Sequence, residues 1–303
     1  MPDPRHILFV TLSNIGDAVM TTPVLAALRA RYPQARFDIV ADARSAALFE
    51  HFDALDEIIL KNKNARWRDK LAFVRQLRRK RYDLIVDLRT DGLGWLLRAK
   101  RRLHKVKHHP PERHSVVRHF MAIEPLLGHI QPPPAELWIA PATHARVAAW
   151  LQVLPGKRWL ALGPGANWEG KIWPAAHFAE LAQHCAGQFD AVIFLGSAAD
   201  SARVADIVRT LSLPCLDLTG KSGLLEAAAV LQRATAFVGN DSGLGHLASA
   251  VGTPTLTVFG PGEPLRYHPW GTRAHWLIAP GNDLARLDVA KVAEQLNDLL
   301  NTP

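Results

Sequence analysis

The stretch AFVGNDSGLGHLASAVGTPTLTVFG, residues 236–260, decides the fold class of this chain. It holds two short apolar runs, residues 236–240 and 255–260, separated by a helical pattern that is rich in small residues. The apolar residues in each run are continuous, which is typical of parallel strands that are buried on both faces. A strand, a helix and a second strand in this order predict a βαβ unit with a right-handed crossover.

The same alternation continues on both sides of this unit. Further strands are expected at residues 6–10, 37–41, 57–60, 83–88, 159–163, 191–196 and 275–279, and helices at 17–32, 177–185, 224–232 and 284–300. The Pro-rich segment QPPPAELWIAP, residues 131–141, is expected to be a linker, because proline fixes φ and donates no hydrogen bond. We therefore predict an α/β protein with two Rossmann-like domains, residues 1–140 and 157–303, facing a cleft. The last helix can pack on either domain.

The composition favours a cytoplasmic protein. No apolar run reaches the roughly 18 residues that a membrane span needs. The first residues, MPDPRHILFV, lack the architecture of a signal peptide and lead directly into the first expected strand. The two cysteines, Cys185 and Cys215, have neither metal-site spacing nor the density of a secreted scaffold. We expect both thiols to be small core residues in a reducing compartment.

Positive charge is concentrated in the first half of the chain. The net charge is +8, and residues 61–119 contain 19 Lys and Arg against 5 Asp and Glu, an excess of +14 that leaves −6 for the rest. Such a stretch attracts phosphate-bearing partners: nucleic acid, an anionic membrane surface or a phosphorylated substrate. For any single Lys or Arg, a solvated helix face is the competing interpretation.

Ligands of doubly wound sheets bind at the carboxyl ends of the strands, so the turns there are the candidate sites. The first such turn, TLSNIGDAVMTTP, places Asp17 at or near a helix start. One interpretation is an N-terminal capping acid, which stabilises a helix by roughly 1 kcal/mol. The other is a carboxylate that points into the cleft and acts as a general base. Position alone leaves both open.

Two later turns have the composition of phosphate sites. In GPGANWEGKIWP, residues 163–174, glycines allow a close backbone approach and Lys171 supplies a positive charge. In residues 239–254, a strand ends at Asn240 and a helix begins after Ser242, so free N–H groups at the helix start can bind a diphosphate. His246 can point at the same phosphates, although a lone helical histidine is more often a core or surface residue.

Other catalytic motifs are missing from the sequence. It contains no Walker A pattern, no H-E-x-x-H and no G-x-S-x-G. His108 and His109 lie beside Lys105 and Lys107, where like charges oppose a metal ion. No D-x-D pair suggests dependence on a divalent cation. We therefore predict that the protein needs neither a metal nor a cofactor.

Three segments together resemble glycosyltransferase family 9, the ADP-heptose:lipopolysaccharide heptosyltransferases. They are SNIGDAVMTTPVLAALRARYPQA, PGANWEGKIWPAAHFAEL, and NDSGLGHLASAVGTPTLTVFGP followed by HPWG. The resemblance covers nearly the whole chain. It implies a GT-B fold and an inverting transfer of heptose from ADP-heptose to the lipopolysaccharide inner core, by an enzyme at the periphery of the inner membrane. The implied partners are this nucleotide sugar, an anionic lipid-linked saccharide and, transiently, the inner leaflet, but no nucleic acid.

The resemblance also implies roles for individual residues. Asp17 matches the family's catalytic base. The positions that hold the nucleotide sugar in the family correspond here to Asn167, Lys171, Asp241, Ser242, Gly243, Leu244 and His246. The acceptor-phosphate region corresponds to Arg66, Arg68 and Lys70 around Trp67, and also to His114 and Arg118.

The sequence departs from the family pattern in two places. Many members place an acid after the strand that corresponds to residues 191–196, whereas here Asp200 is the nearest acid, one position later. The segment between Leu88 and His114 is shorter than in some members. Two alternatives stay open: a sugar-nucleotide epimerase or hydrolase of the same architecture, and a nucleic-acid-binding protein that uses residues 61–119.

Overall fold

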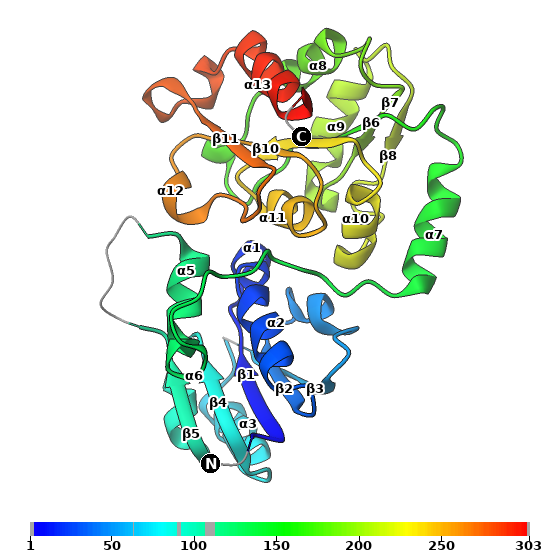
Figure 1. The fold of residues 1–303 in the computed structure, drawn as a ribbon. Helices are drawn as coiled ribbons and strands as arrows, with labels where there is room; N and C mark the ends of the chain where they lie inside the picture. The colour runs from blue at the N-terminus through cyan, green and yellow to red at the C-terminus, as the bar shows by residue number, and fades with distance from the viewer. Residues whose placement is uncertain (1–2, 63, 90–91, 107–112, 302–303) are drawn as a thin grey trace. The chain divides into compact units, whose positions relative to one another are not determined.

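The computed structural model describes residues 3–62, 64–89, 92–106 and 113–301 (Figure 1). The chain divides into two compact units, Met1–Trp138 and Ile139–Pro303. The first boundary lies two residues before the expected end of the first domain at residue 140. Within the described ranges, no helix combines the length and apolar character that crossing a bilayer requires.

Unit 1 is built on a five-stranded parallel sheet with the order β3-β2-β1-β4-β5. Its strands are β1 (His6–Val10), β2 (Arg36–Ala41), β3 (Leu55–Leu60), β4 (Tyr82–Asp87) and β5 (Ala99–His104). Its helices are α1 (Ile15–Val19), α2 (Thr22–Arg31), α3 (Trp67–Leu77), α4 (Leu93–Leu96), α5 (Ser115–Phe120) and α6 (Glu124–Leu127), with short 3₁₀ helices at Ala46–Phe49 and Met121–Ile123. Figure 1 shows α2 and α3 on opposite faces of this sheet.

Unit 2 has a six-stranded parallel sheet with the order β11-β10-β9-β6-β7-β8. Its strands are β6 (Trp159–Gly163), β7 (Ala191–Phe194), β8 (Cys215–Asp217), β9 (Ala236–Asn240), β10 (Thr255–Phe259) and β11 (Ala274–Ile278). Its α-helices are α7 (Pro141–Leu151), α8 (Ala175–His184), α9 (Ser201–Val208), α10 (Leu224–Leu231), α11 (Gly243–Ala250), α12 (Pro264–Tyr267) and α13 (Val289–Asn301). Short 3₁₀ helices span Glu169–Lys171, Ala198–Asp200, Pro280–Asn282 and Leu284–Arg286.

The last helix packs on unit 2. Val292, Leu296 and Leu299 of α13 are buried in the same apolar core as Trp173 and Phe178. Cys185 lies in this core as predicted, whereas Cys215, at the edge strand β8, is only half-buried. Burial raises the pKa of both thiols. The sequence left the position of α13 open, and its apolar stripe settles it.

The predicted helix at residues 17–32 is instead two helices. α1 ends at Val19 and α2 begins at Thr22. Pro23 has no N–H to donate to the carbonyl of Val19, and the Thr22 hydroxyl donates to that carbonyl over 2.9 Å instead. The prediction of one continuous helix at residues 17–32 was wrong, because Pro23 interrupts the helical hydrogen bonding.

The linker lies against unit 1. Residues 129–140 form no helix or strand, as expected. Trp138 packs edge-to-face on Phe52 with ring centroids 4.7 Å apart, and the N–H of Glu136 donates to the Thr22 hydroxyl. These contacts hold the segment in place although it has no regular hydrogen bonding of its own.

Candidate active site

In unit 2 the chain reverses its strand order between β6 and β9. These strands are neighbours in the sheet, and Gly163 at the end of β6 pairs with Gly239 of β9. A Cβ atom at Gly239 would lie 2.5 Å from the Phe237 ring and 3.0 Å from the carbonyl oxygen of Gly163. Glycine is therefore required for the two strands to approach at the point where ligands of such sheets bind.

Asn240 ties the two turns of this site together. It is fully buried at the end of β9, and its Oδ1 accepts a hydrogen bond of 2.9 Å from the N–H of Trp173. The Trp173 indole is also fully buried and donates to the carbonyl of Leu287. Both residues lie inside the quoted motifs, but nothing in their spacing predicts this structural role.

Lys171 and Asp241, two predicted donor-site residues, form an ion pair. Their side chains are 26% and 13% exposed, so the pair lies at the edge of the protein interior. Asp241 holds the ammonium group beside the start of α11. A bound diphosphate would compete with Asp241 for this ammonium group.

The start of α11 has the properties of an anion site. Its N-cap residue, Ser242, has extended backbone angles (φ −147°, ψ 173°), and its side chain makes no capping hydrogen bond. Among the described residues, no group accepts from or donates to the buried Ser242 hydroxyl. The first N–H groups of the helix, which begins at Gly243 and Leu244, thus lack a capping side chain and carry the positive end of the helix dipole.

His246 is buried and neutral. It is only 6% exposed, and burial, together with the nearby His268, lowers its pKa to about 4. Its Nδ1 has no hydrogen-bond partner in the described part of the chain. At neutral pH the imidazole is therefore uncharged and can donate a hydrogen bond to a phosphate. The prediction that it contacts the donor stays a prediction.

Asn167 and Asp200 differ in their burial and in their hydrogen bonding within the protein. Asn167 lies exposed in the turn after β6. Asp200 is buried, and its carboxylate accepts hydrogen bonds from the N–H and hydroxyl of Ser197, at 2.9 and 2.7 Å. A Cβ atom at Gly165 would lie 2.3 Å from this carboxylate. Asp200 therefore caps a helical turn and packs on the backbone of the donor turn.

In unit 1, Asp17 stands in the first turn of α1, at the carboxyl end of β1. The N-cap residue of α1 is Asn14, so Asp17 is not the capping acid that one interpretation required. The Asn14 side chain instead donates from Nδ2 to the Asp17 Oδ2 over 2.9 Å. Asp17 is half-buried, which leaves its carboxylate accessible.

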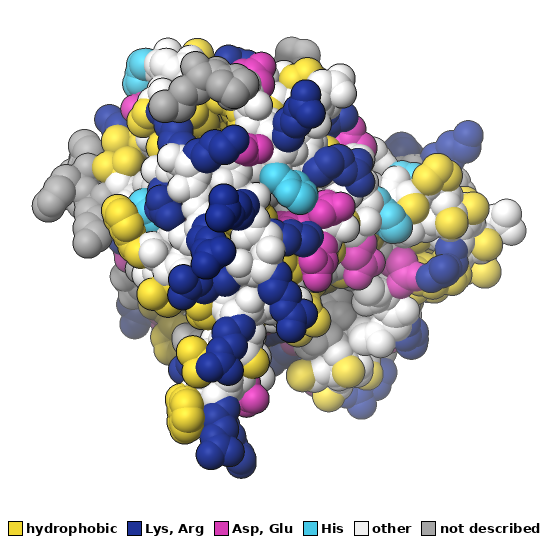
Figure 2. Space-filling model, turned by 90° about the horizontal axis from the view of Figure 1, so that it is seen from below, with side chains coloured by type: hydrophobic (Ala, Val, Ile, Leu, Met, Phe, Trp, Pro, Cys, Tyr) yellow, Lys and Arg dark blue, Asp and Glu magenta, His cyan; other side chains and the backbone are white. Residues whose placement is uncertain are grey.

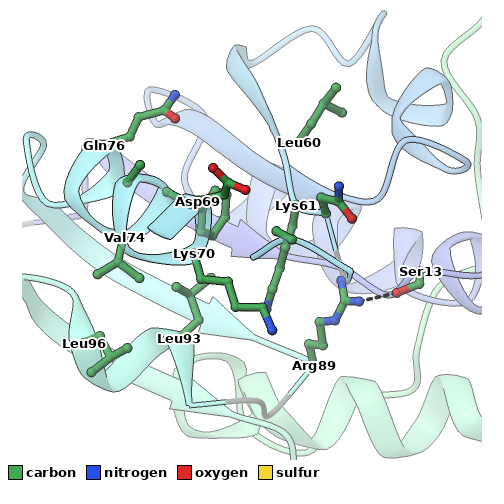
Figure 3. A pocket seen from close by; sticks show the side chains of 14 residues that line it. Ser13, Leu60, Lys61, Asp69, Lys70, Val74, Gln76, Arg89, Leu93 and Leu96 are labelled. Carbon is green, nitrogen blue, oxygen red and sulfur yellow. Dashed lines mark hydrogen bonds between the residues drawn. The ribbon is translucent and has the colours of Figure 1, made fainter. Parts of the chain in front are cut away.

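A cavity of about 890 Å³ opens beside the carboxyl ends of β1, β3 and β4 (Figure 3). It is lined by Ser13, Leu60, Lys61, Asn62, Ala65, Asp69, Lys70, Ala72, Phe73, Val74, Gln76, Arg89, Leu93 and Leu96. Figure 3 shows the guanidinium of Arg89 hydrogen-bonded to the Ser13 hydroxyl. Sequence reasoning missed Ser13, Lys61 and Arg89, although each follows closely on the end of a strand.

Only some of the residues predicted to bind the acceptor lie at or near this cavity. Lys70 lines this cavity, and Arg66 and Arg68 lie exposed at the start of α3. His114 does not line it: this residue is buried, and its Nδ1 accepts from the N–H of Val116 as the cap of α5. Arg118 lies half-buried on α5, also away from the cavity lining. For His114 the structure thus provides a capping role.

One group of metal-binding residue types occurs at the other end of the unit 1 sheet. His6, Asp38 and Asp56, within the described part of the chain, have ligand atoms within 4.8 Å of one another. The Lys80 ammonium already donates to Asp38 at 2.9 Å and to Asp56 at 3.1 Å, so it provides the cation of this cluster. His108 and His109 lie outside the described residues. That the enzyme needs no metal stays a prediction.

The sequence matches the profile of glycosyltransferase family 9 (heptosyltransferase) over residues 70–296. The chain belongs to this family. It is 28% identical to lipopolysaccharide heptosyltransferase 3 of Escherichia coli over 285 residues, which cover 84% of this chain and 83% of that protein. This chain is therefore a glycosyltransferase.

Solved structures agree in fold. E. coli ADP-heptose lps heptosyltransferase II superposes with a TM-score of 0.82 at 24% identity, covering 97% of this chain and 98% of that one. The E. coli heptosyltransferase WaaC with ADP gives a TM-score of 0.77 at 23% identity, covering 97% and 99%. The expected GT-B fold with two Rossmann-like domains is confirmed.

Proposed function

We propose that this enzyme transfers heptose from ADP-heptose to the inner core of lipopolysaccharide, in the cytoplasm at the periphery of the inner membrane. The observation that carries the donor assignment is the uncapped start of α11 beside the Lys171–Asp241 pair, at the strand reversal of unit 2. Membership of a heptosyltransferase family and the likeness to a structure solved with ADP support the choice of sugar and nucleotide.

The reaction is a single inverting displacement. An acceptor hydroxyl oxygen attacks the anomeric carbon while the bond from that carbon to the β-phosphate oxygen breaks. Asp17 accepts the hydroxyl proton, and ADP departs with the bonding electron pair. A general base typically contributes about 10²- to 10⁴-fold. The hydrogen bond from Asn14 orients the Asp17 carboxylate for this step.

Negative charge that develops on ADP is stabilised by fixed groups of unit 2. The Lys171 ammonium and the first N–H groups of α11 face this charge without a metal ion. His246, whose imidazole is kept neutral by burial, offers the phosphates of ADP a hydrogen bond. Lys70, Arg66 and Arg68 bind phosphates of the acceptor.

A donor screen tests the proposal. Release of ADP or UDP is followed from a set of nucleotide sugars, with and without truncated lipopolysaccharide acceptors. We expect ADP release from ADP-heptose only when an acceptor is present. Equal release without acceptor would identify a hydrolase, and an isomerised sugar without transfer would identify an epimerase.

A further inference from the structure

The outer face of α3 carries large apolar side chains into solvent. Trp67, Leu71, Arg75 and Arg78 follow one another at intervals of four, four and three residues, so they lie along one side of the helix. Trp67 is 69% exposed and Leu71 is 42% exposed. The opposite side packs on the unit 1 core through Phe73 and Leu77, and Val74 at the edge of the exposed stripe also contacts this core. α3 is thus anchored from one side, while its other side has apolar groups that the described chain does not cover.

Other exposed apolar side chains gather next to α3. Trp95 and Leu96 of α4 are 70% and 57% exposed, and Leu60 at the end of β3 is 57% exposed. Leu60 and Leu96 line the same cavity as α3 (Figure 3). Of the ten large hydrophobic residues that are exposed in the described chain, Leu60 and Leu96 line this cavity, and Trp67, Leu71 and Trp95 belong to the two helices, α3 and α4, that contribute other residues to its lining. An apolar cluster of this kind marks a contact surface, whereas scattered single residues do not.

Cations without ion pairs accompany these apolar groups. Arg66, Arg68, Arg75 and Arg78 are exposed, and none of them pairs with an acid in the part of the chain that the structure describes. The Arg68 guanidinium lies 5.4 Å from the centre of the Trp67 ring. Figure 2 shows a face of the molecule on which Lys and Arg side chains predominate, with hydrophobic ones beside them.

We propose that this surface, formed by Trp67, Leu71 and Arg75 of α3, the C-cap residue Arg78, and Trp95 and Leu96 of α4, docks on an anionic lipid bilayer. Tryptophan rings favour the headgroup level, leucines reach the acyl boundary, and arginines pair with lipid phosphates. A nucleic acid would satisfy the arginines but would offer no apolar layer to Leu71 and Leu96. The proposal deepens the proposed function, on which it rests for the lipid-linked acceptor.

Sedimentation of the full-length protein with lipid vesicles tests this surface. We expect binding to vesicles that contain phosphatidylglycerol, weakened by added salt, and no binding to phosphatidylcholine alone. Each cation removed should weaken binding about fivefold, so Arg75→Gln with Arg78→Gln should weaken it about 25-fold. The matched control is Arg273→Gln with Lys291→Gln on unit 2, where both side chains are exposed.

A second measurement reports insertion. Brominated lipids should quench tryptophan fluorescence in the wild type and less in Trp67→Ser, whereas Trp168→Ser, which removes a 55% exposed ring of unit 2, should keep the quenching. Equal binding of neutral and anionic vesicles, or an unchanged affinity of the Arg75/Arg78 variant, would overturn the proposal. Binding of duplex DNA without binding of vesicles would assign the surface to nucleic acid instead.

Transfer to a truncated acceptor without acyl chains separates this proposal from the proposed function. If the wild type transfers heptose but ignores vesicles, only the docking surface is wrong. If it binds anionic vesicles in the predicted way but transfers no heptose, the proposed function is wrong and the docking surface stands.

Discussion

The side-chain amide of Asn14 donates from Nδ2 to Oδ2 of Asp17 over 2.9 Å. Asn14 is the N-cap residue of α1, yet its side chain makes no capping bond to the helix backbone. Its amide group donates to the carboxylate of Asp17 instead. The bond fixes one oxygen of Asp17 and leaves the other for an incoming proton.

Asn14→Ala removes this orientation without touching the carboxylate. We expect kcat to fall about tenfold, because small misplacements of a catalytic group can cost as much as about 10²-fold. Donor affinity should not change, since the donor is assigned to unit 2. Steady-state kinetics and titration with ADP measure the two effects, with the exposed Asn297→Ala of α13 as control. An unchanged kcat would show that Asn14 does not position the base.

Asp17→Asn keeps the shape of the side chain but cannot accept a proton at neutral pH. We predict a fall in kcat of at least about 10²-fold, within the range for loss of a general base. The melting temperature and ADP affinity should stay near the wild-type values. A purely structural role predicts the reverse, a near-normal kcat, and that result would refute the mechanism.

Charge reversal of Arg66 and Arg68 should act on the acceptor alone. Both residues lie exposed at the start of α3 in unit 1. We expect the acceptor KM to rise and the affinity for ADP to stay the same, measured side by side in the double Glu variant. The same reversal at Arg273 and Lys291 of unit 2 is the control. Equal weakening of both ligands would contradict the assignment of acceptor and donor to different units.

Removal of metal ions should leave the reaction intact. The assigned stabilising groups are the Lys171 ammonium and the start of α11, neither of which needs a divalent ion. Transfer rates in excess EDTA should match those without chelator. Full loss of activity in EDTA that Mg²⁺ or Mn²⁺ restores would mean that these groups do not suffice.

Because His246 is buried, we expect the free energy of unfolding to decrease in mild acid. Its pKa is lowered to about 4 in the folded chain, so between about pH 6.5 and 4 the unfolded chain binds the extra proton. The free energy of unfolding of unit 2 should therefore fall as the pH is lowered, by roughly 2 kcal/mol between pH 7 and pH 5. Urea unfolding at several pH values measures this. His246→Gln should lose that part of the pH dependence, and an identical slope would show that another group causes it.

Most strands could be predicted because burial on both faces leaves a continuous apolar run. β9 and β10 are buried at every position, and both were predicted within one residue. β5, with the sequence AKRRLH, was missed because its basic residues hide the pattern at the sheet edge. β8 was missed because three residues are too short for any periodicity.

The residues of the candidate site could be predicted where they belong to the motifs quoted from the sequence. Asp17, Lys171 and Asp241 lie in the segments that follow β1, β6 and β9, as expected from the general rule for such sheets. The Lys171–Asp241 pair and the Asn14–Asp17 bond could not be foreseen, since each depends on side-chain directions that spacing does not determine. The capping role of His114 was hidden for the same reason.

The composition of β5 has a consequence for solubility. An edge strand presents unpaired N–H and C=O groups, and a long apolar edge is a template on which other chains can aggregate. Lys100 and Arg101 project from β5 as exposed charges, and β8 leaves only three residues at the corresponding edge of its own sheet. Charge on β5 and the shortness of β8 thus protect one edge of each sheet against strand-to-strand aggregation.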